Sequence, residues 1–118
     1  MALGVLIGAF GAHSLKSQLS ADMMQIYKTG VEYLFYNALG LMAIGLAGFH
    51  VHSRWLIRAG ILIVFGIVLF SGSLFALALT GIKLLGIVTP FGGVSFVIGW
   101  IFFAISLTKK QAVSVAEN

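Results

Sequence analysis

Seven polar side chains have the chemistry to hold a ligand or to move a proton, and they lie beside or inside long apolar stretches: His13, Glu32, Tyr33, Asn37, Ser71, Ser73 and Thr89. An ionisable group at membrane depth is costly and marks a candidate functional site. A histidine can relay a proton or ligate a metal, whereas amides and hydroxyls exchange hydrogen bonds. We therefore expect these side chains to converge in a polar cluster that binds a small ligand or a lipid headgroup.

Each of these residues also has a structural interpretation, which the sequence leaves open. Glu32 can pair with Lys28, one helical turn before it, and His13 can bond a neighbouring carbonyl or carboxylate. Asn37 and the two serines can bond between helices, an interaction worth about 0.6 kcal/mol on average in membranes. Tyr33 also suits the aromatic belt at a membrane surface.

The sequence contains no pattern that indicates catalysis. It has no phosphate-binding glycine loop and no adjacent pair of carboxylates, and the lack of cysteine excludes thiolate chemistry. His50 and His52 alternate without a third ligand nearby, so they do not predict a metal site. We expect a protein that is not an enzyme, with no catalytic residue, metal or cofactor.

The elements that position these side chains must be membrane helices. Of 118 residues, 60% are hydrophobic and only 8% are charged, whereas soluble domains carry about 25% charged residues. The uncharged runs 33–53, 59–82 and 84–108 reach the length of about 20 residues that a spanning helix needs. They lack the alternation of a β-barrel, and the scattered basic residues argue against nucleic-acid binding.

These patterns predict an all-α integral membrane four-helix bundle in one domain. The spans are expected at about 2–15, 31–49, 59–79 and 89–107, with a polar tail at 108–118 and an interfacial segment between the first two helices. The first helix is foreshortened. No basic segment precedes it, so a missing start explains it better than a signal peptide.

Small residues repeat along two of the expected spans. Gly4 and Gly8 lie four residues apart in the first, and Gly92 and Gly99 lie in the fourth. Such stripes allow close helix contact in membranes, so we expect these four glycines to pack helices.

Loop charges indicate the orientation. One side of the membrane carries four basic residues, which are Arg54, Arg58, Lys109 and Lys110. The opposite side carries three, which are Lys16, Lys28 and Lys83. The positive-inside rule therefore predicts that both termini are cytoplasmic.

The bilayer is the expected partner, and the glycine faces also suit a second copy or another membrane protein. One alternative is a small oligomeric transporter or channel, because four short helices leave little room for an internal path. Another is an accessory subunit of a larger membrane complex. The sequence does not separate these alternatives.

Four blocks of sequence, at residues 8–13, 30–36, 71–79 and 89–100, resemble the YgdD/YwdK-like small inner-membrane family. The resemblance implies a four-helix protein of the bacterial plasma membrane, with no established activity, substrate or cofactor. That family commonly has histidine where this chain has Asn37, and tyrosine where it has Phe75. Asparagine cannot titrate, so this chain would have lost any proton or metal chemistry at that position.

Overall fold

The computed structural model describes the backbone of residues 1–117 and the side chains of residues 1–109, and the described chain is helical. Its elements are α1 (Ala2–Phe10), the π-helical η1 (Gly11–Leu15), α2 (Ala21–Ala47), α3 (Arg54–Thr80), the 3-10 helix η2 (Lys83–Ile87) and α4 (Thr89–Glu117). Three segments are long and apolar enough to cross a membrane, and the apolar segment Ala2–Leu15 is shorter. The predicted all-α membrane bundle with a foreshortened first helix is confirmed.

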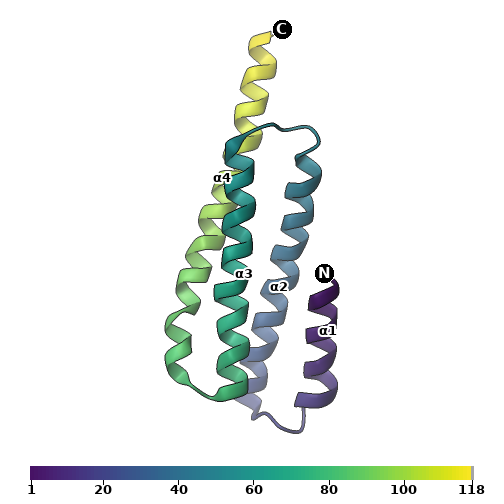
Figure 1. Cartoon of the computed structure of the whole chain (residues 1–118), viewed down its shortest axis with the longest axis vertical. Coiled ribbons are helices and arrows are strands. Elements are labelled where there is room, and N and C mark those ends of the chain that lie inside the picture. Colours follow the sequence, from purple (N-terminus) through teal and green to yellow (C-terminus); the bar gives the residue numbers. More distant parts are fainter. Residues whose placement is uncertain (118) are drawn as a thin grey trace.

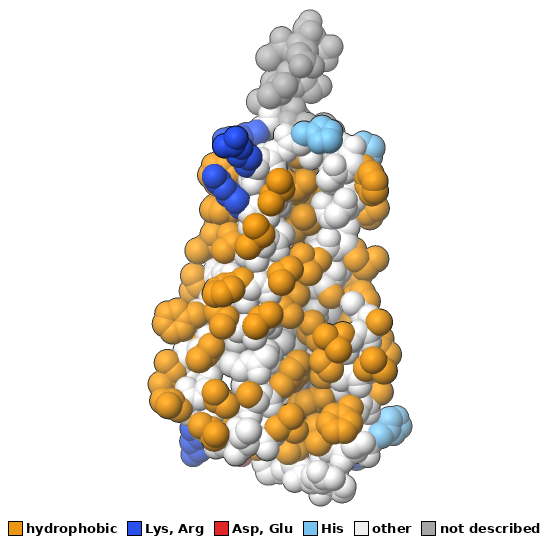
Figure 2. All heavy atoms as spheres, in the orientation of Figure 1, with side chains coloured by type: hydrophobic (Ala, Val, Ile, Leu, Met, Phe, Trp, Pro, Cys, Tyr) orange, Lys and Arg blue, Asp and Glu red, His pale blue; other side chains and the backbone are white. Residues whose placement is uncertain are grey.

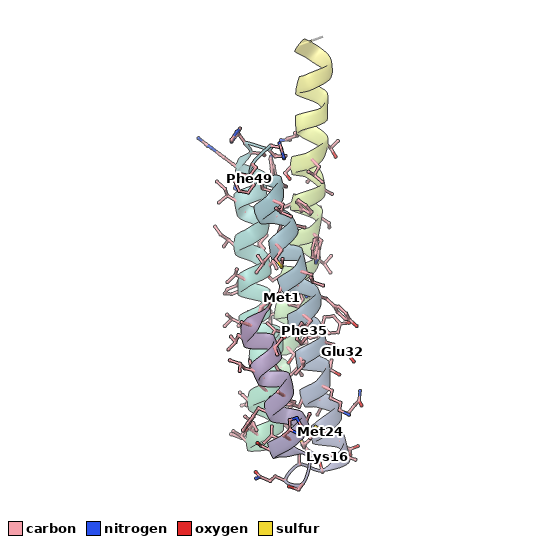
Figure 3. The ribbon with its side chains drawn as sticks, turned by 90° about the vertical axis from the view of Figure 1, so that its right-hand side faces the viewer. Met1, Lys16, Met24, Glu32, Phe35 and Phe49 are labelled. Carbon is pink, nitrogen blue, oxygen red and sulfur yellow. The ribbon has the colours of Figure 1, made fainter. Side chains whose placement is uncertain are left out.

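The helices lie side by side in the order in which the chain forms them (Figure 1). α3 packs against α2 on one side and α4 on the other, and α1 lies along α2. The molecule measures 62 × 26 × 15 Å, so it is much thinner than it is wide. Met1 lies beside the middle of α2 (Figure 3).

Polar and apolar surfaces are segregated along the long axis. Figure 2 shows hydrophobic side chains over most of one face, with Lys, Arg and His side chains at its ends. The exposed apolar side chains include Leu39, Ile61 and Val97 on three different helices. A lipid-facing surface requires this arrangement, because no water is present there to solvate polar groups.

Glycines mark the places where helices come closest. A Cβ on Gly92 would lie 2.8 Å from Cα of Phe70, and one on Gly99 would lie 2.9 Å from Cδ1 of Ile63. These two glycines thus allow α4 to approach α3 more closely than any larger residue would.

α1 approaches α2 in the same manner. A Cβ on Gly4 would be 3.3 Å from Cζ of Phe35, and one on Gly8 would be 3.5 Å from Cγ1 of Val31. The two glycines of α1 therefore face α2.

The beginning of α2 includes the segment expected at the interface. Residues 21–30 form the first turns of α2 and continue into the rest of the helix without a break. Ser20 caps the helix by accepting a hydrogen bond from the amide of Met23 at 3.2 Å. Tyr27 is buried with Leu15 and Ala78, so this segment packs within the bundle.

α3 extends beyond its expected span at both ends, and α4 extends beyond its expected span at the C-terminal end. α3 begins at Arg54, where the Ser53 side chain accepts from the amide of Trp55, and it ends before Gly81. Gly81 has φ of 73°, a conformation that glycine adopts without strain. The helical backbone of α4 continues to Glu117. Polar capping residues, rather than the ends of the apolar runs, thus set the starts of α2 and α3.

Candidate functional site

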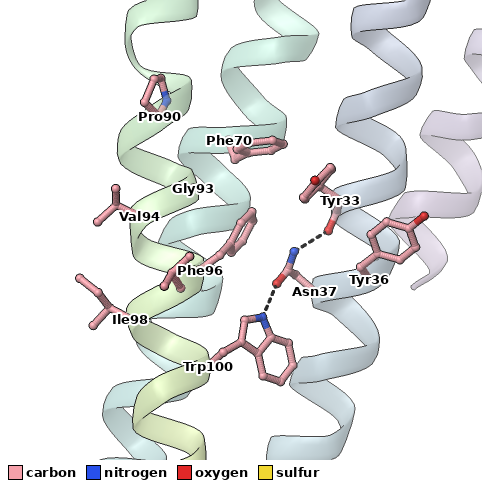
Figure 4. Close-up of a pocket in the computed structure, with 11 residues that line it drawn as sticks. Tyr33, Tyr36, Asn37, Phe70, Pro90, Gly93, Val94, Phe96, Ile98 and Trp100 are labelled. Carbon is pink, nitrogen blue, oxygen red and sulfur yellow. Dashed lines mark hydrogen bonds between the residues drawn. The ribbon is translucent and has the colours of Figure 1, made fainter.

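Asn37 links α2 to α4 through its side chain (Figure 4). Its Nδ2 donates to the carbonyl of Tyr33 at 2.9 Å, and its Oδ1 accepts from Nε1 of Trp100 at 3.1 Å. Gly40, one turn further along α2, leaves the space for the indole, because a Cβ there would overlap the ring of Trp100. Both ends of the buried amide are therefore engaged by the protein itself.

Three serines and one threonine make further links to or from α3. Ser71 donates to the carbonyl of Gly30 in α2 at 2.7 Å. The hydroxyls of Ser73 and Thr89 lie 2.6 Å apart and join α3 to the start of α4. Ser95 of α4 donates to a carbonyl of α3 at 2.6 Å. Across the described side chains, every buried nitrogen or oxygen has a hydrogen-bond partner.

The structure places His13 and Glu32 apart from these links. His13 is exposed in η1, and Glu32 is exposed on α2. Glu32 and Lys28 line a cavity of about 180 Å³ between α1 and α2. The seven polar residues are therefore not brought together at one place, and Asn37, Ser71, Ser73 and Thr89 act in separate links between helices.

A groove of about 720 Å³ lies between α2 and α4, with Phe70 of α3 among its lining residues (Figure 4). Its size falls within the range of about 300–1,000 Å³ that small-molecule sites occupy. The ring of Phe70 lies between two others, with centroids 4.6 Å from Tyr33 and 5.5 Å from Phe96. The remaining lining residues are Tyr36, Asn37, Pro90, Gly93, Val94, Val97, Ile98 and Trp100.

The chemistry of this groove is apolar with a hydrogen-bonding edge. Tyr33 and Tyr36 stand edge to face with centroids 5.8 Å apart, and both side chains are exposed. Among the side chains of residues 1–109, none that is charged lines the groove. The residues that the structure describes also hold no group of three or more His, Cys, Asp or Glu that suits a metal. The arrangement supports burial of an apolar chain and hydrogen bonding to a neutral group.

Sequence reasoning placed Tyr33 and Asn37 among the candidates but missed the aromatic residues Phe70, Phe96 and Trp100. A signal for the groove exists in α4. Pro90, Gly93, Val97 and Trp100 recur at intervals of three or four residues, which places them on one helical face.

Comparison with known proteins identifies the family. The model of the family described as "Protein of unknown function (DUF423)" matches residues 7–93, which is more than half of the 118 residues. The chain belongs to the DUF423 family.

Named relatives of this DUF423 chain are membrane proteins. It is 47% identical over 111 residues to a UPF0382 membrane protein of Staphylococcus epidermidis, covering 92% of the chain and 87% of that relative. It is 43% identical over 108 residues to the UPF0382 membrane protein YwdK of Bacillus subtilis, covering 91% and 88%. It is 40% identical over 114 residues to the UPF0382 inner membrane protein YgdD of Escherichia coli, covering 97% and 87%. No solved structure matches it.

These matches confirm the resemblance to the YgdD/YwdK-like family. Together with the three long apolar helices, the matches indicate that this DUF423 protein is inserted in a membrane. The family description assigns no activity, so the function of this DUF423 protein has to be argued from its groove.

Proposed function

We propose that the protein is a non-catalytic membrane protein that binds one amphiphilic molecule in the groove between α2 and α4. The groove itself carries this proposal, because it combines about 720 Å³ of space with an aromatic lining and two tyrosines at its edge. The apolar part of the ligand lies along Val94 and Val97, and a neutral polar group pairs with the hydroxyl of Tyr33. Bilayer lipids supply molecules of this shape at high local concentration.

The hydrogen bonds between helices support a role other than catalysis. Asn37 is bonded at both ends, and Ser71 and Ser73 are bonded to neighbouring helices. General acid–base or nucleophilic catalysis needs a side chain that is free to exchange a proton with the substrate. These side chains instead hold the walls of the groove in place.

The location proposed is the bacterial plasma membrane, with the loop between α2 and α3 and the C-terminal end of α4 on the cytoplasmic side, and with α1 starting beside the middle of α2 and directed away from that side. The support is the excess of one basic residue on that side of the sequence. In this orientation Thr89 lies toward the outer half of the bilayer, because it begins α4 at the end opposite the loop, and Tyr33 lies near the middle of α2. The ligand then enters from the outer leaflet.

A small oligomeric transporter is a second candidate, and the flatness of the molecule favours it. A chain only 15 Å thick has two broad faces, so copies could enclose a path that one copy does not. Crosslinking in native membranes tests this candidate. A transporter of this kind requires a discrete oligomer, and finding only a monomer would exclude it. An accessory role in a larger complex predicts instead that a different protein is captured.

The groove can be tested by filling it. A Cβ on Gly93 would lie 3.8 Å from Cδ2 of Phe70, an ordinary contact, whereas a Cβ on Gly72 meets nothing within 4 Å. Gly93→Leu therefore fills the groove, and Gly72→Leu adds the same side chain to an open face of α3. Native mass spectrometry of protein released from membrane-derived nanodiscs would measure the retained molecules.

We expect the wild type and Gly72→Leu to retain a stoichiometric amphiphile that Gly93→Leu has lost. Equal retention by both variants would show that the molecule lies elsewhere. Release of the wild type without any bound molecule would overturn the proposal. Circular dichroism of each variant checks that the helices are intact.

A further inference from the structure

A second hollow lies at the end of the molecule that carries the loop between α2 and α3. It measures about 380 Å³, and its lining includes His52, Ser53, Arg54 and Ile57. His52 and Arg54 are exposed. This end is far along the bundle from Tyr33, so the hollow is separate from the groove between α2 and α4.

An apolar groove continues from this hollow along α3. It measures about 600 Å³, includes Leu41 of α2, and shares Ile57 with the hollow. Ile57, Ile61, Val64 and Val68 follow one another on one face of α3 at intervals of three or four residues. From Ile57 to Val68 the helix rises roughly 16 Å, which is close to half of the 30 Å hydrocarbon core. The groove therefore has about the length of one lipid leaflet.

Arg54 lines the hollow, and two further cations lie at the same end of the molecule without an acidic partner among the described side chains. Arg54 opens α3, and its first turn contains no acidic residue. Arg58 lies over the indole of Trp55 at 5.4 Å, and Nζ of Lys109 lies over the same ring at 4.8 Å. One half-buried indole thus brings two positive charges close together, and Figure 2 shows Lys and Arg side chains gathered at this end.

The chain supplies little to neutralise these charges. It has three acidic residues, of which Asp22 and Glu32 lie in the first half of α2. The third, Glu117, is eight residues beyond Lys109, and its side chain lies outside the described residues. An anion beside Arg58 would relieve the repulsion between Arg58 and Lys109, which lie over the same indole.

We propose that this end binds an anionic phospholipid, with its phosphate at Arg54 and Arg58 and one acyl chain along Ile57 to Val68. The positive charge of the arginines favours a phosphate group, and the continuous apolar groove favours a phosphate that is attached to an acyl chain. Arginine pairs with phosphate through two parallel hydrogen bonds. Cations beside a membrane also favour its anionic lipids.

The test compares headgroups on the full chain. Protein in nanodiscs of equal phosphatidylglycerol and phosphatidylcholine is released into a native mass spectrometer, and the retained lipids are counted. We expect the wild type to retain phosphatidylglycerol in preference to phosphatidylcholine. Each arginine contributes a factor of about five to this preference, so the double variant Arg54→Gln, Arg58→Gln should lower it more than tenfold.

Matched variants separate a site from general surface charge. Lys16→Gln with Lys83→Gln removes the same two charges at the other end and should leave the preference unchanged. Arg54→Lys with Arg58→Lys keeps the charge and should retain most of it. Equal loss in both glutamine double variants, or no preference in the wild type, would overturn the proposal.

Two further arms test the chain and the source of the phosphate. A Cβ on Gly60 would lie 3.7 Å from Cγ2 of Ile44, so Gly60→Leu should fit and should displace the acyl chain, while Gly72→Leu should not. Millimolar inorganic phosphate should leave lipid retention unchanged, and displacement by phosphate would show that the hollow binds a free anion instead. Because Gly93→Leu acts on the other groove, this proposal and the proposed function can fail independently.

Discussion

The contact between α3 and α4 at Gly92 makes the sharpest prediction about stability. In Gly92→Ala the new Cβ would lie 2.8 Å from Cα of Phe70, while carbon atoms prefer about 3.5–4.0 Å, so the helices must separate by about 1 Å. Overpacking of this kind costs about 1–3 kcal/mol. Separation also weakens the hydrogen bond of Ser95 to α3 and that between Ser73 and Thr89, each worth about 0.6 kcal/mol.

Gly93→Ala is the matched control. It makes the same chemical change one residue along the same helix, where the nearest atom to the new Cβ is Cδ2 of Phe70 at 3.8 Å. The gain in helix propensity is common to both variants and cancels in their difference. We therefore expect the free energy of unfolding of Gly92→Ala to lie about 2–4 kcal/mol below that of Gly93→Ala.

The measurement is an unfolding titration with sodium dodecyl sulfate in mixed micelles, followed by circular dichroism and by fluorescence of Trp55 and Trp100. The expected result is an earlier midpoint for Gly92→Ala alone. If the two variants unfold at the same midpoint, α3 and α4 do not pack through this glycine and the close approach described above is refuted. A lower midpoint for both variants would refute the specific placement of Gly92 as well.

Three further changes can be measured in the same titration. Ser71→Ala removes a hydrogen bond between helices and should lower the free energy of unfolding by about 0.6 kcal/mol. Ser106→Ala should lower it less, because the Ser106 hydroxyl bonds a carbonyl of its own helix. Equal losses would contradict the link from Ser71 to α2. Trp100→Phe should lower the free energy of unfolding at least as much as Ser71→Ala, because it leaves the side-chain oxygen Oδ1 of Asn37 without its donor. An unchanged midpoint would contradict this expectation. Gly81→Ala should cost about 1–2 kcal/mol, because φ is 73° there, and a neutral result would argue against that turn.

Hydrophobic run length was enough to predict the class of the fold. The runs indicated the three long spans and the short first helix. The continuity of residues 21–30 with the rest of α2 was not predicted, because Gln25 and Lys28 make these turns polar. Their polarity suggested an interfacial segment, whereas the burial of Tyr27 brings those turns into the bundle.

The partners of the polar residues could not be predicted from the sequence. Which carbonyl Ser71 reaches, or which donor faces Asn37, depends on the rotation of each helix about its axis. Such rotation is set by the close packing of small and large side chains, as where Gly40 receives Trp100. A single sequence shows which residues are small, but it does not show which large residue on another helix fills the space.

The serial arrangement of the helices has a consequence for biosynthesis. α3 packs between its two neighbours in the chain, so each helix meets its partner as soon as the following segment has been made. α3 can dock on α2 while α4 is still being synthesised, and α4 then adds to an exposed side. No later segment has to insert between helices that are already paired, and the protein can assemble in the order in which it leaves the ribosome.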